Sequence, residues 1–194
     1  PDNVTTVTIE PGVEFKMADN QIIVGDNSDP NLPGGLIANG TLAEPIIFTS
    51  RMPSPVAGDW DGIYFTQYSD DTQCSLTHCT IEYGDPNLDI NGCSPQITDS
   101  EIRYSADDGV TISGSQQNPS FTRCRIHSNL SEGLTSRSGT VQLLDCIIED
   151  NDFFGLWIEQ NQSQTTQTQI ENCLLQNNQV AGMRISGAYN DALI

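Results

Sequence analysis

The chain has 194 residues, and its seven Lys and Arg against 26 Asp and Glu give a formal net charge of −19 at pH 7. This charge repels nucleic acid and anionic membranes, disfavours unaided binding of polyuronates, and makes cations the natural partners. No run of 18 apolar residues is present, so we expect no insertion into a membrane.

The first 75 residues predict strands in a loose arrangement. Short runs rich in β-branched and aromatic residues alternate with Gly, Pro and Asn turns, as at 7–17, 36–41 and 45–50. Trp60 and Tyr64 follow, next to two aspartates. Aromatic rings beside carboxylates suit sugar hydroxyls, which makes both residues candidates for carbohydrate binding. A core or corner position is the alternative for Trp60.

A repeat begins near residue 76. Its units place Cys or Ser nine positions before a Gly and five positions before a small turn residue. The anchors are Ser100, Cys124, Cys146 and Cys173, the glycines are Gly109, Gly133, Gly155 and Gly182, and the turn residues are Ser105, Asn129, Asn151 and Asn178. The spacing between units varies outside this shared part, as it does when loops leave a regular coil.

Each unit predicts three short strands. In the strand after the Gly, apolar residues that point inward alternate with residues that point outward, as in Val110, Thr111 and Ile112. This period of two is typical of strands rather than helices. Asn suits the turn because it tolerates left-handed backbone angles and, in stacked coils, pairs with the Asn above and below.

These units predict an all-β fold, a right-handed parallel β-helix that forms a solenoid of about eight three-strand coils. We expect one domain over residues 1–194, with looser coils at 1–75 and regular coils at 76–194, as a fragment of a longer protein. Because open coils expose strand edges, end-to-end self-association is also expected.

Four cysteines occupy one position of the repeat. Cys79, Cys124, Cys146 and Cys173, with Ser100 between the first two, predict an inward ladder of small polarisable side chains. Cys74 and Cys93 lie outside this ladder. They would form one disulfide if the protein is exported, and otherwise remain thiols.

An acidic loop near residue 85 is a candidate calcium site. Asp85, Asn87, Asp89 and Asn91 place oxygen-bearing side chains at alternate positions, as calcium loops do. The same segment also fits a strand with its apolar residues inward, and this alternative would separate the oxygens.

A charged column is expected at the outward position after the inward Ile of each unit. Its members are Glu82, Arg103, His127, Glu149 and Gln176. Opposite charges on adjacent strands would form a stabilising ladder. The functional alternative is a catalytic cleft, in which Glu82 or Glu149 acts as acid or base while Arg103 or His127 stabilises developing charge.

Further candidates lie in the regular coils. Trp157 is expected to point outward beside two phenylalanines and is the better exposed aromatic for carbohydrate binding. Asp107 and Asp108 precede the repeat Gly, where turn residues are expected, and would otherwise form a catalytic pair. Thr111 and Thr135 align in one column, but Trp157 interrupts it, which argues against ice binding.

The repeats, with the stretch GGLIANGTLAEPIIFTS at 34–50 followed by GDWDGIYF at 58–65, resemble the right-handed β-helix superfamily of pectate-lyase-like folds and bacterial secreted or surface proteins. The resemblance covers nearly the whole chain and implies the fold, but this fold hosts lyases, hydrolases, adhesins and stalks. The Asp pair of the polygalacturonase-like hydrolases is similar to 107–108. Lys16 is the only Lys, however, and no His-Gly occurs.

We therefore expect a non-catalytic structural or adhesive module of a secreted or cell-surface bacterial protein. Its expected partner is a polysaccharide or cell-surface glycan, and Ca²⁺ is the one cofactor considered. The alternative is a polysaccharide lyase or glycoside hydrolase that works on the outer face of the β-helix.

Overall fold

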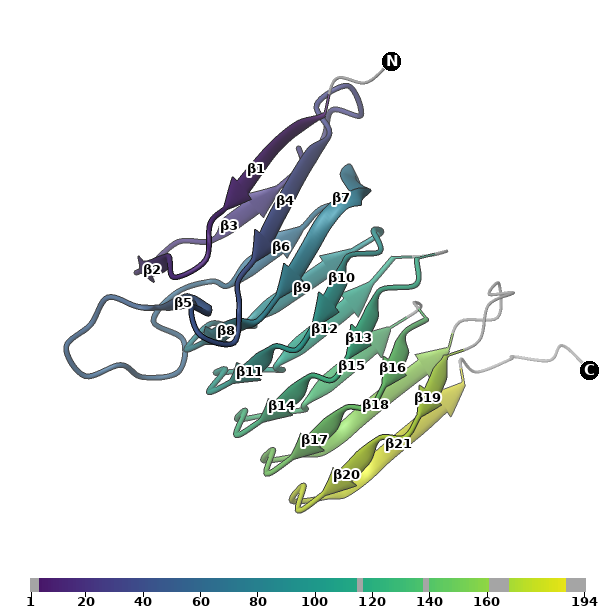
Figure 1. The fold of residues 1–194 in the computed structure, drawn as a ribbon. Coiled ribbons are helices and arrows are strands. Elements are labelled where there is room, and N and C mark those ends of the chain that lie inside the picture. The colour runs from purple at the N-terminus through teal and green to yellow at the C-terminus, as the bar shows by residue number, and fades with distance from the viewer. Residues whose placement is uncertain (1–3, 115–116, 138–139, 161–167, 188–194) are drawn as a thin grey trace, which may run out of the picture.

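The computed structural model describes residues 4–114, 117–137, 140–160 and 168–187, and the regular structure in these ranges consists of β-strands. The strands form three parallel seven-stranded sheets, which we call A, B and C (Figure 1). Each coil adds one strand to sheet A, then one to B and one to C. The predicted all-β parallel β-helix is confirmed.

Sheet A contains β1 (Thr5–Ile9), β4 (Gly34–Asn39), β7 (Ser69–Thr77), β10 (Gln96–Thr98), β13 (Ser120–Thr122), β16 (Gln142–Leu144) and β19 (Gln169–Glu171). Sheet B contains β2 (Glu14–Met17), β5 (Ile46–Ser50), β8 (Cys79–Glu82), β11 (Glu101–Arg103), β14 (Arg125–His127), β17 (Ile147–Glu149) and β20 (Leu174–Gln176). Sheet C contains β3 (Ile22–Val24), β6 (Ile63–Phe65), β9 (Leu88–Asn91), β12 (Val110–Ser113), β15 (Leu134–Arg137), β18 (Phe154–Gln160) and β21 (Ala181–Gly187).

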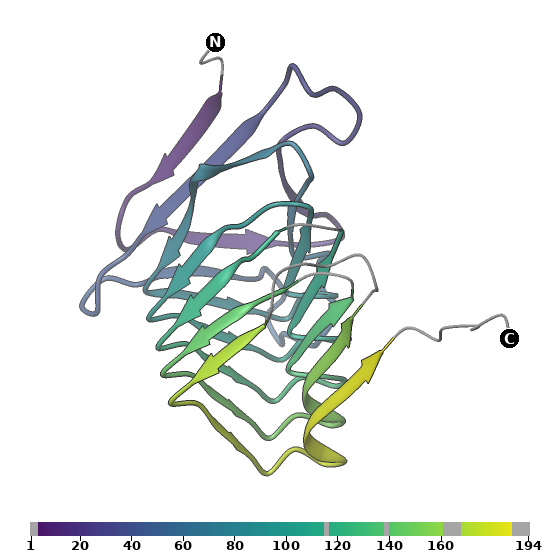
Figure 2. The same ribbon diagram turned by 90° about the vertical axis from the view of Figure 1, so that its right-hand side faces the viewer.

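The described residues form seven coils, where about eight were expected from the usual repeat length. The first coils use more residues because long segments, 25–33 and 51–62, connect their strands. Figure 2 shows the stack, with the first coil in purple at one end and the last coil in yellow at the other.

The core is a stack of apolar side chains from the three sheets. In sheet B the inward column is Phe48, Ile81, Ile102, Ile126 and Ile148, all fully buried and in register from strand to strand. Equivalent columns line sheets A and C. Burying one such side chain stabilises the fold by roughly 1.5–3 kcal/mol, so stacking identical positions supplies the energy that holds the coils together.

The Asn ladder is confirmed at the turn between sheets B and C. The Oδ1 atom of Asn151 accepts hydrogen bonds from the backbone N–H and the Nδ2 of Asn129, at 3.2 and 2.8 Å. Its own Nδ2 donates to Oδ1 of Asn178 at 2.8 Å. Ser128 and Asp150, which precede the first two of these residues by one position, have left-handed backbones with φ of 55° and 54°. The ladder therefore pairs polar groups that this tight turn buries.

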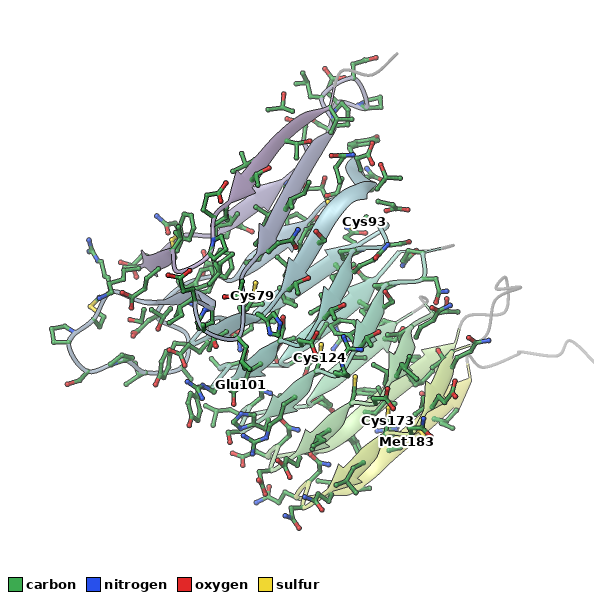
Figure 3. The ribbon with its side chains drawn as sticks, in the orientation of Figure 1. Cys79, Cys93, Glu101, Cys124, Cys173 and Met183 are labelled. Atoms are coloured by element: carbon green, nitrogen blue, oxygen red, sulfur yellow. The ribbon has the colours of Figure 1, made fainter. Side chains whose placement is uncertain are left out.

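The cysteine ladder is also confirmed. Cys79, Cys124 and Cys146 are buried at equivalent positions of their coils, with the Ser100 coil between the first two. Figure 3 shows Cys79, Cys124 and Cys173 following one line along the solenoid. Ser100 fits the ladder because its hydroxyl accepts the Cys79 N–H at 3.0 Å. Cys74 and Cys93, like the ladder cysteines, are free thiols, so the expected disulfide is not formed in this structure.

Apolar side chains are exposed at both ends of the solenoid. In the first coil, Val7 and Ile23 are 55 % and 51 % exposed and help line a mainly apolar cavity of about 510 Å³. In the last coil, Met183 and Ile185 are 44 % and 70 % exposed, and Figure 3 labels Met183 there. End-to-end self-association through these surfaces stays a prediction.

Candidate functional site

From β8 to β17, the outer face of sheet B carries six charged or titratable side chains, which we call the charged ladder. Its members are Glu82, Glu101, Arg103, Arg125, His127 and Glu149. They come from β8, β11, β14 and β17, whose register places Arg103 between Glu82 and His127 and places His127 beside Glu149. The predicted column is thus brought together, and Figure 3 labels one member, Glu101, that the prediction did not include.

In the N-terminal part of the charged ladder, the carboxylates are held by short ion pairs and hydrogen bonds. Glu82 accepts hydrogen bonds from the Thr49 hydroxyl and from Nε of Arg103, both at 2.8 Å. Nη1 of Arg103 donates to Glu101 at 3.0 Å. The Arg103 guanidinium also lies 5.2 Å from the ring centre of Tyr104. No oxygen of Glu82 is left without a partner.

In the C-terminal part of the charged ladder, the carboxylates are held by ion pairs and hydrogen bonds as well. Nε2 of His127 lies 2.7 Å from Glu101, and Nη2 of Arg125 lies 2.6 Å from Glu149. Gln176 donates to the other oxygen of Glu149, also at 2.6 Å. Hydrogen bonds from Gln176 and Arg125 lower the pKa of Glu149, so this carboxyl is held as an anion rather than as a proton donor.

This geometry favours the stabilising interpretation of the ladder. Glu82 and Glu149 are three strand spacings apart, about 14 Å at ~4.8 Å per strand, whereas glycosidase carboxylates lie roughly 5–9.5 Å apart. Each ion pair on such a surface contributes up to about 1 kcal/mol. Arg125 and Glu101 were missed because the prediction followed one of the two outward columns, and these residues occupy the other.

On the outer face of sheet A, two columns of side chains from β4 to β16 carry no charge, and we call these two columns the neutral face. Asp70 and Asp71 lie in β7 outside them. The first column contains Ile37, Ser75, Gln96, Ser120 and Gln142, and the second contains Asn39, Thr77, Thr98, Thr122 and Leu144. Within the described strands of sheet A, these columns meet a charge only at Glu171 in β19. Such a face is unexpected in a chain with a net charge of −19.

A simple signal marks the neutral face in the sequence. Its side chains stand four and two positions before the Cys or Ser of each repeat, as Gln96 and Thr98 stand before Ser100. The buried residue between them points inward, as Ile97 does. The prediction used that inward residue alone and did not follow its outward neighbours.

The predicted carbohydrate-binding aromatics differ in their surroundings. Trp60 is fully buried and donates its indole N–H to the Glu82 carbonyl at 2.8 Å, so it is a corner anchor with no ring face for a sugar. Tyr64 lies half-buried on the outer face of sheet C, where its hydroxyl accepts a hydrogen bond from Asn91 at 3.1 Å. Trp157 points outward as predicted, but the Arg184 guanidinium lies 4.7 Å from its ring centre.

The four oxygen-bearing residues of the acidic loop lie in different surroundings. Asp89 and Asn91 belong to β9 and alternate with buried Leu88 and Ile90, as the strand alternative required. Asn87 is fully buried and bonds Gly84 N–H and the Arg103 carbonyl. Asp85 is exposed in the turn outside the strand. Across the described ranges, no three His, Cys, Asp or Glu side chains come together as a metal site.

The two aspartates at 107–108 differ in their exposure to solvent. Asp107 is exposed, whereas Asp108 is 1 % exposed and accepts the Glu132 N–H at 3.2 Å and the Thr111 hydroxyl at 3.3 Å. Glu132, on the next coil, is 4 % exposed. Burial, together with the Asp108 carboxyl, raises the pKa of Glu132. The buried carboxyl pair is thus Asp108 with Glu132.

We expect Glu132→Gln to stabilise the protein at pH 7.5 by on the order of 1 kcal/mol, because an amide removes the buried like charge. Because the pKa of Glu132 is raised in the folded protein, the protonated carboxyl favours folding at acidic pH. This contribution is lost as the pH rises through the folded pKa. The gain should therefore vanish near pH 4. Urea unfolding at both pH values measures it.

Glu149→Gln is the matched control for this substitution. Because the pKa of Glu149 is lowered in the folded protein, the ionised carboxylate stabilises the fold above the unfolded pKa. This stabilisation is lost as the pH falls through the folded pKa. This variant should therefore be less stable than the original protein at pH 7.5. Equal effects of the two substitutions would contradict the assignment of the buried pair.

Comparisons with known proteins bear on the fold. A family model described as right handed beta helix region matches residues 56–194. No curated protein and no solved structure matches the chain. In the described part of the chain, no helix is long and apolar enough to cross a membrane.

Proposed function

Since the chain belongs to the right-handed β-helix family, its outer faces rather than its fold determine what it binds, and we propose that it binds a neutral glycan along the neutral face. In this proposal it is a non-catalytic adhesive module of a secreted or cell-surface bacterial protein. Its partner is a neutral polysaccharide or a neutral cell-surface glycan.

The absence of charge on the neutral face is the observation that carries this proposal. Hydroxyl and amide side chains such as Thr98 and Gln96 donate and accept hydrogen bonds, as sugar hydroxyls do, without the desolvation cost of a buried ion. The face spans five strands, about 19 Å along the solenoid at ~4.8 Å per strand. A glycan chain of several sugar units fits along such a length.

The net charge of the chain adds selectivity. A glycan that carries carboxylates or sulfates meets a protein with a net charge of −19, and this repulsion slows its approach and weakens its binding. A neutral glycan meets no such barrier. We therefore expect discrimination between neutral and acidic polysaccharides of similar shape.

The charged ladder supports a binding role over a catalytic one. An acid or base must reach the scissile bond, yet the oxygens of Glu82 and Glu149 are held by Arg103, Arg125 and neighbouring polar groups. The Asp108 and Glu132 carboxyls are buried.

Affinity electrophoresis on gels that contain defined polysaccharides tests the proposal. We expect neutral polysaccharides to retard the protein, a polyuronate of similar length to leave its mobility unchanged, and calcium or chelator to have no effect. Preferential retardation by the polyuronate would contradict the proposal. So would new reducing ends in the retarded samples, because they would indicate a hydrolase or lyase.

A further inference from the structure

A groove of about 310 Å³ lies at the corner between sheets A and B, and we call it the corner groove. Its lining consists of Thr41, Leu42, Pro45, His78, Cys79, Thr80, Asp99, Ser100, Glu101, Arg123 and Arg125. Ligand sites usually measure about 300–1,000 Å³, so this volume suits a ligand the size of one sugar ring.

Consecutive turns build one wall of the corner groove. His78, Asp99 and Arg123 are equivalent residues of three coils, each with a left-handed backbone, at φ of 48°, 51° and 53°. They directly follow Thr77, Thr98 and Thr122 in the sequence. The corner groove therefore borders the second column of the neutral face.

Ion pairs hold the charged side chains of this wall in fixed orientations. Nε and Nη2 of Arg123 each donate to one oxygen of Asp99 at 2.7 Å, which holds both side chains in one plane. Arg125 pairs with Glu101 at 3.3 Å. The imidazole of His78 has no hydrogen-bond partner among the described residues.

The corner groove is lined by equal numbers of Arg side chains and carboxylates. Two guanidinium groups and two carboxylates line the groove, so hydrogen-bonding capacity is present and these four charges cancel. An anion or a cation would compete with the opposite charges already present in the lining. A neutral polyhydroxyl ligand would add bonds to both partners of each pair, which is the combination that the lining favours.

Another part of the lining belongs to the segment between β4 and β5 and includes two apolar residues. A turn holds this segment, in which the Glu44 N–H bonds the Thr41 hydroxyl at 3.0 Å. It presents Leu42, which is 88 % exposed, and Pro45 to the corner groove. An exposed Leu in a groove with polar lining groups suits a sugar ring, which has an apolar C–H face and polar edges.

We propose that the corner groove is a side pocket that takes a single neutral pyranose branch of a glycan bound on the neutral face. This inference rests on the proposed function, since the glycan backbone is what delivers the branch to the corner. It adds a specificity element: branched neutral glycans bind more tightly than unbranched ones.

Leu42→Asp tests the pocket without touching the core, because this side chain is almost entirely exposed. We expect the affinity for a branched neutral oligosaccharide, measured by calorimetry, to fall at least about tenfold, and the affinity for its unbranched backbone to remain the same. The control is Leu130→Asp, an exposed Leu at another corner, which should change neither affinity.

Equal affinity of the Leu42→Asp variant and the original protein for the branched ligand would overturn the pocket while leaving the proposed function intact. If no glycan binds, the proposed function fails, and NMR titration with simple methyl pyranosides then judges the corner groove alone. Shifts of the His78 and Leu42 signals would support the pocket. Their absence at saturating pyranoside would overturn it.

Discussion

Replacing Thr98 with Glu is expected to lower the affinity for a neutral glycan at least about tenfold. Thr98 lies in the middle of the neutral face, in register with Thr77 and Thr122. A carboxylate there must be desolvated by the bound sugar, at a cost of several kcal/mol unless a cation compensates it. The fold should tolerate the change because this side chain points outward and is only half-buried.

Ser113→Glu is the control for this substitution. Ser113 ends β12 on sheet C, so the same carboxylate is added to a different face of the solenoid. Calorimetry with the glycan, together with the melting temperature of each variant, separates lost binding from lost stability. A Thr98→Glu variant that melts normally and binds like the original protein would show that the glycan does not use the neutral face.

Replacing Asn151 with Ala is expected to lower the free energy of unfolding by about 3 kcal/mol. Asn151 is 1 % exposed, and its side chain accepts from Asn129 and donates to Asn178. Truncation leaves buried donors and acceptors on both neighbouring coils without partners, at about 1–3 kcal/mol for each such group. Urea unfolding measures the change.

Asn178→Ala provides the comparison at the end of the ladder. Asn178 is half-buried and accepts from Asn151, but the described chain places no further Asn beyond it. Its replacement should therefore cost less than that of Asn151. If both changes cost less than 1 kcal/mol, side-chain stacking of Asn would not be what holds the turns together.

The fold was predictable because its determinants repeat. Cys124 and Cys146 occupy one position of the coil, and Asn129 and Asn151 occupy another, so the pattern is both local and periodic. The predicted number of about eight coils is close to the seven of the described residues, and the difference arises because the long connections of the first coils obscure the period. The structure resolved an alternative that the alternating residues of 85–91 had left open, in favour of a strand.

The candidate site was less predictable. The neutral face is visible in the sequence only when the outward neighbours of Ile97 and Phe121 are followed from coil to coil. The corner groove depends on where the segment around Leu42 packs, and no periodicity indicates that position. Trp60, a candidate for sugar stacking, is a buried anchor instead because the corner encloses its ring.

The location of bound glycan on the solenoid tests the account most directly. Threonine methyl NMR compares two faces in one experiment, since Thr77, Thr98 and Thr122 lie on the neutral face, whereas Thr111 and Thr135 lie on sheet C. On addition of a neutral oligosaccharide, we predict shifts for the three sheet A methyls and none for the two on sheet C. Shifts confined to sheet C, or none on sheet A at saturation, would contradict it.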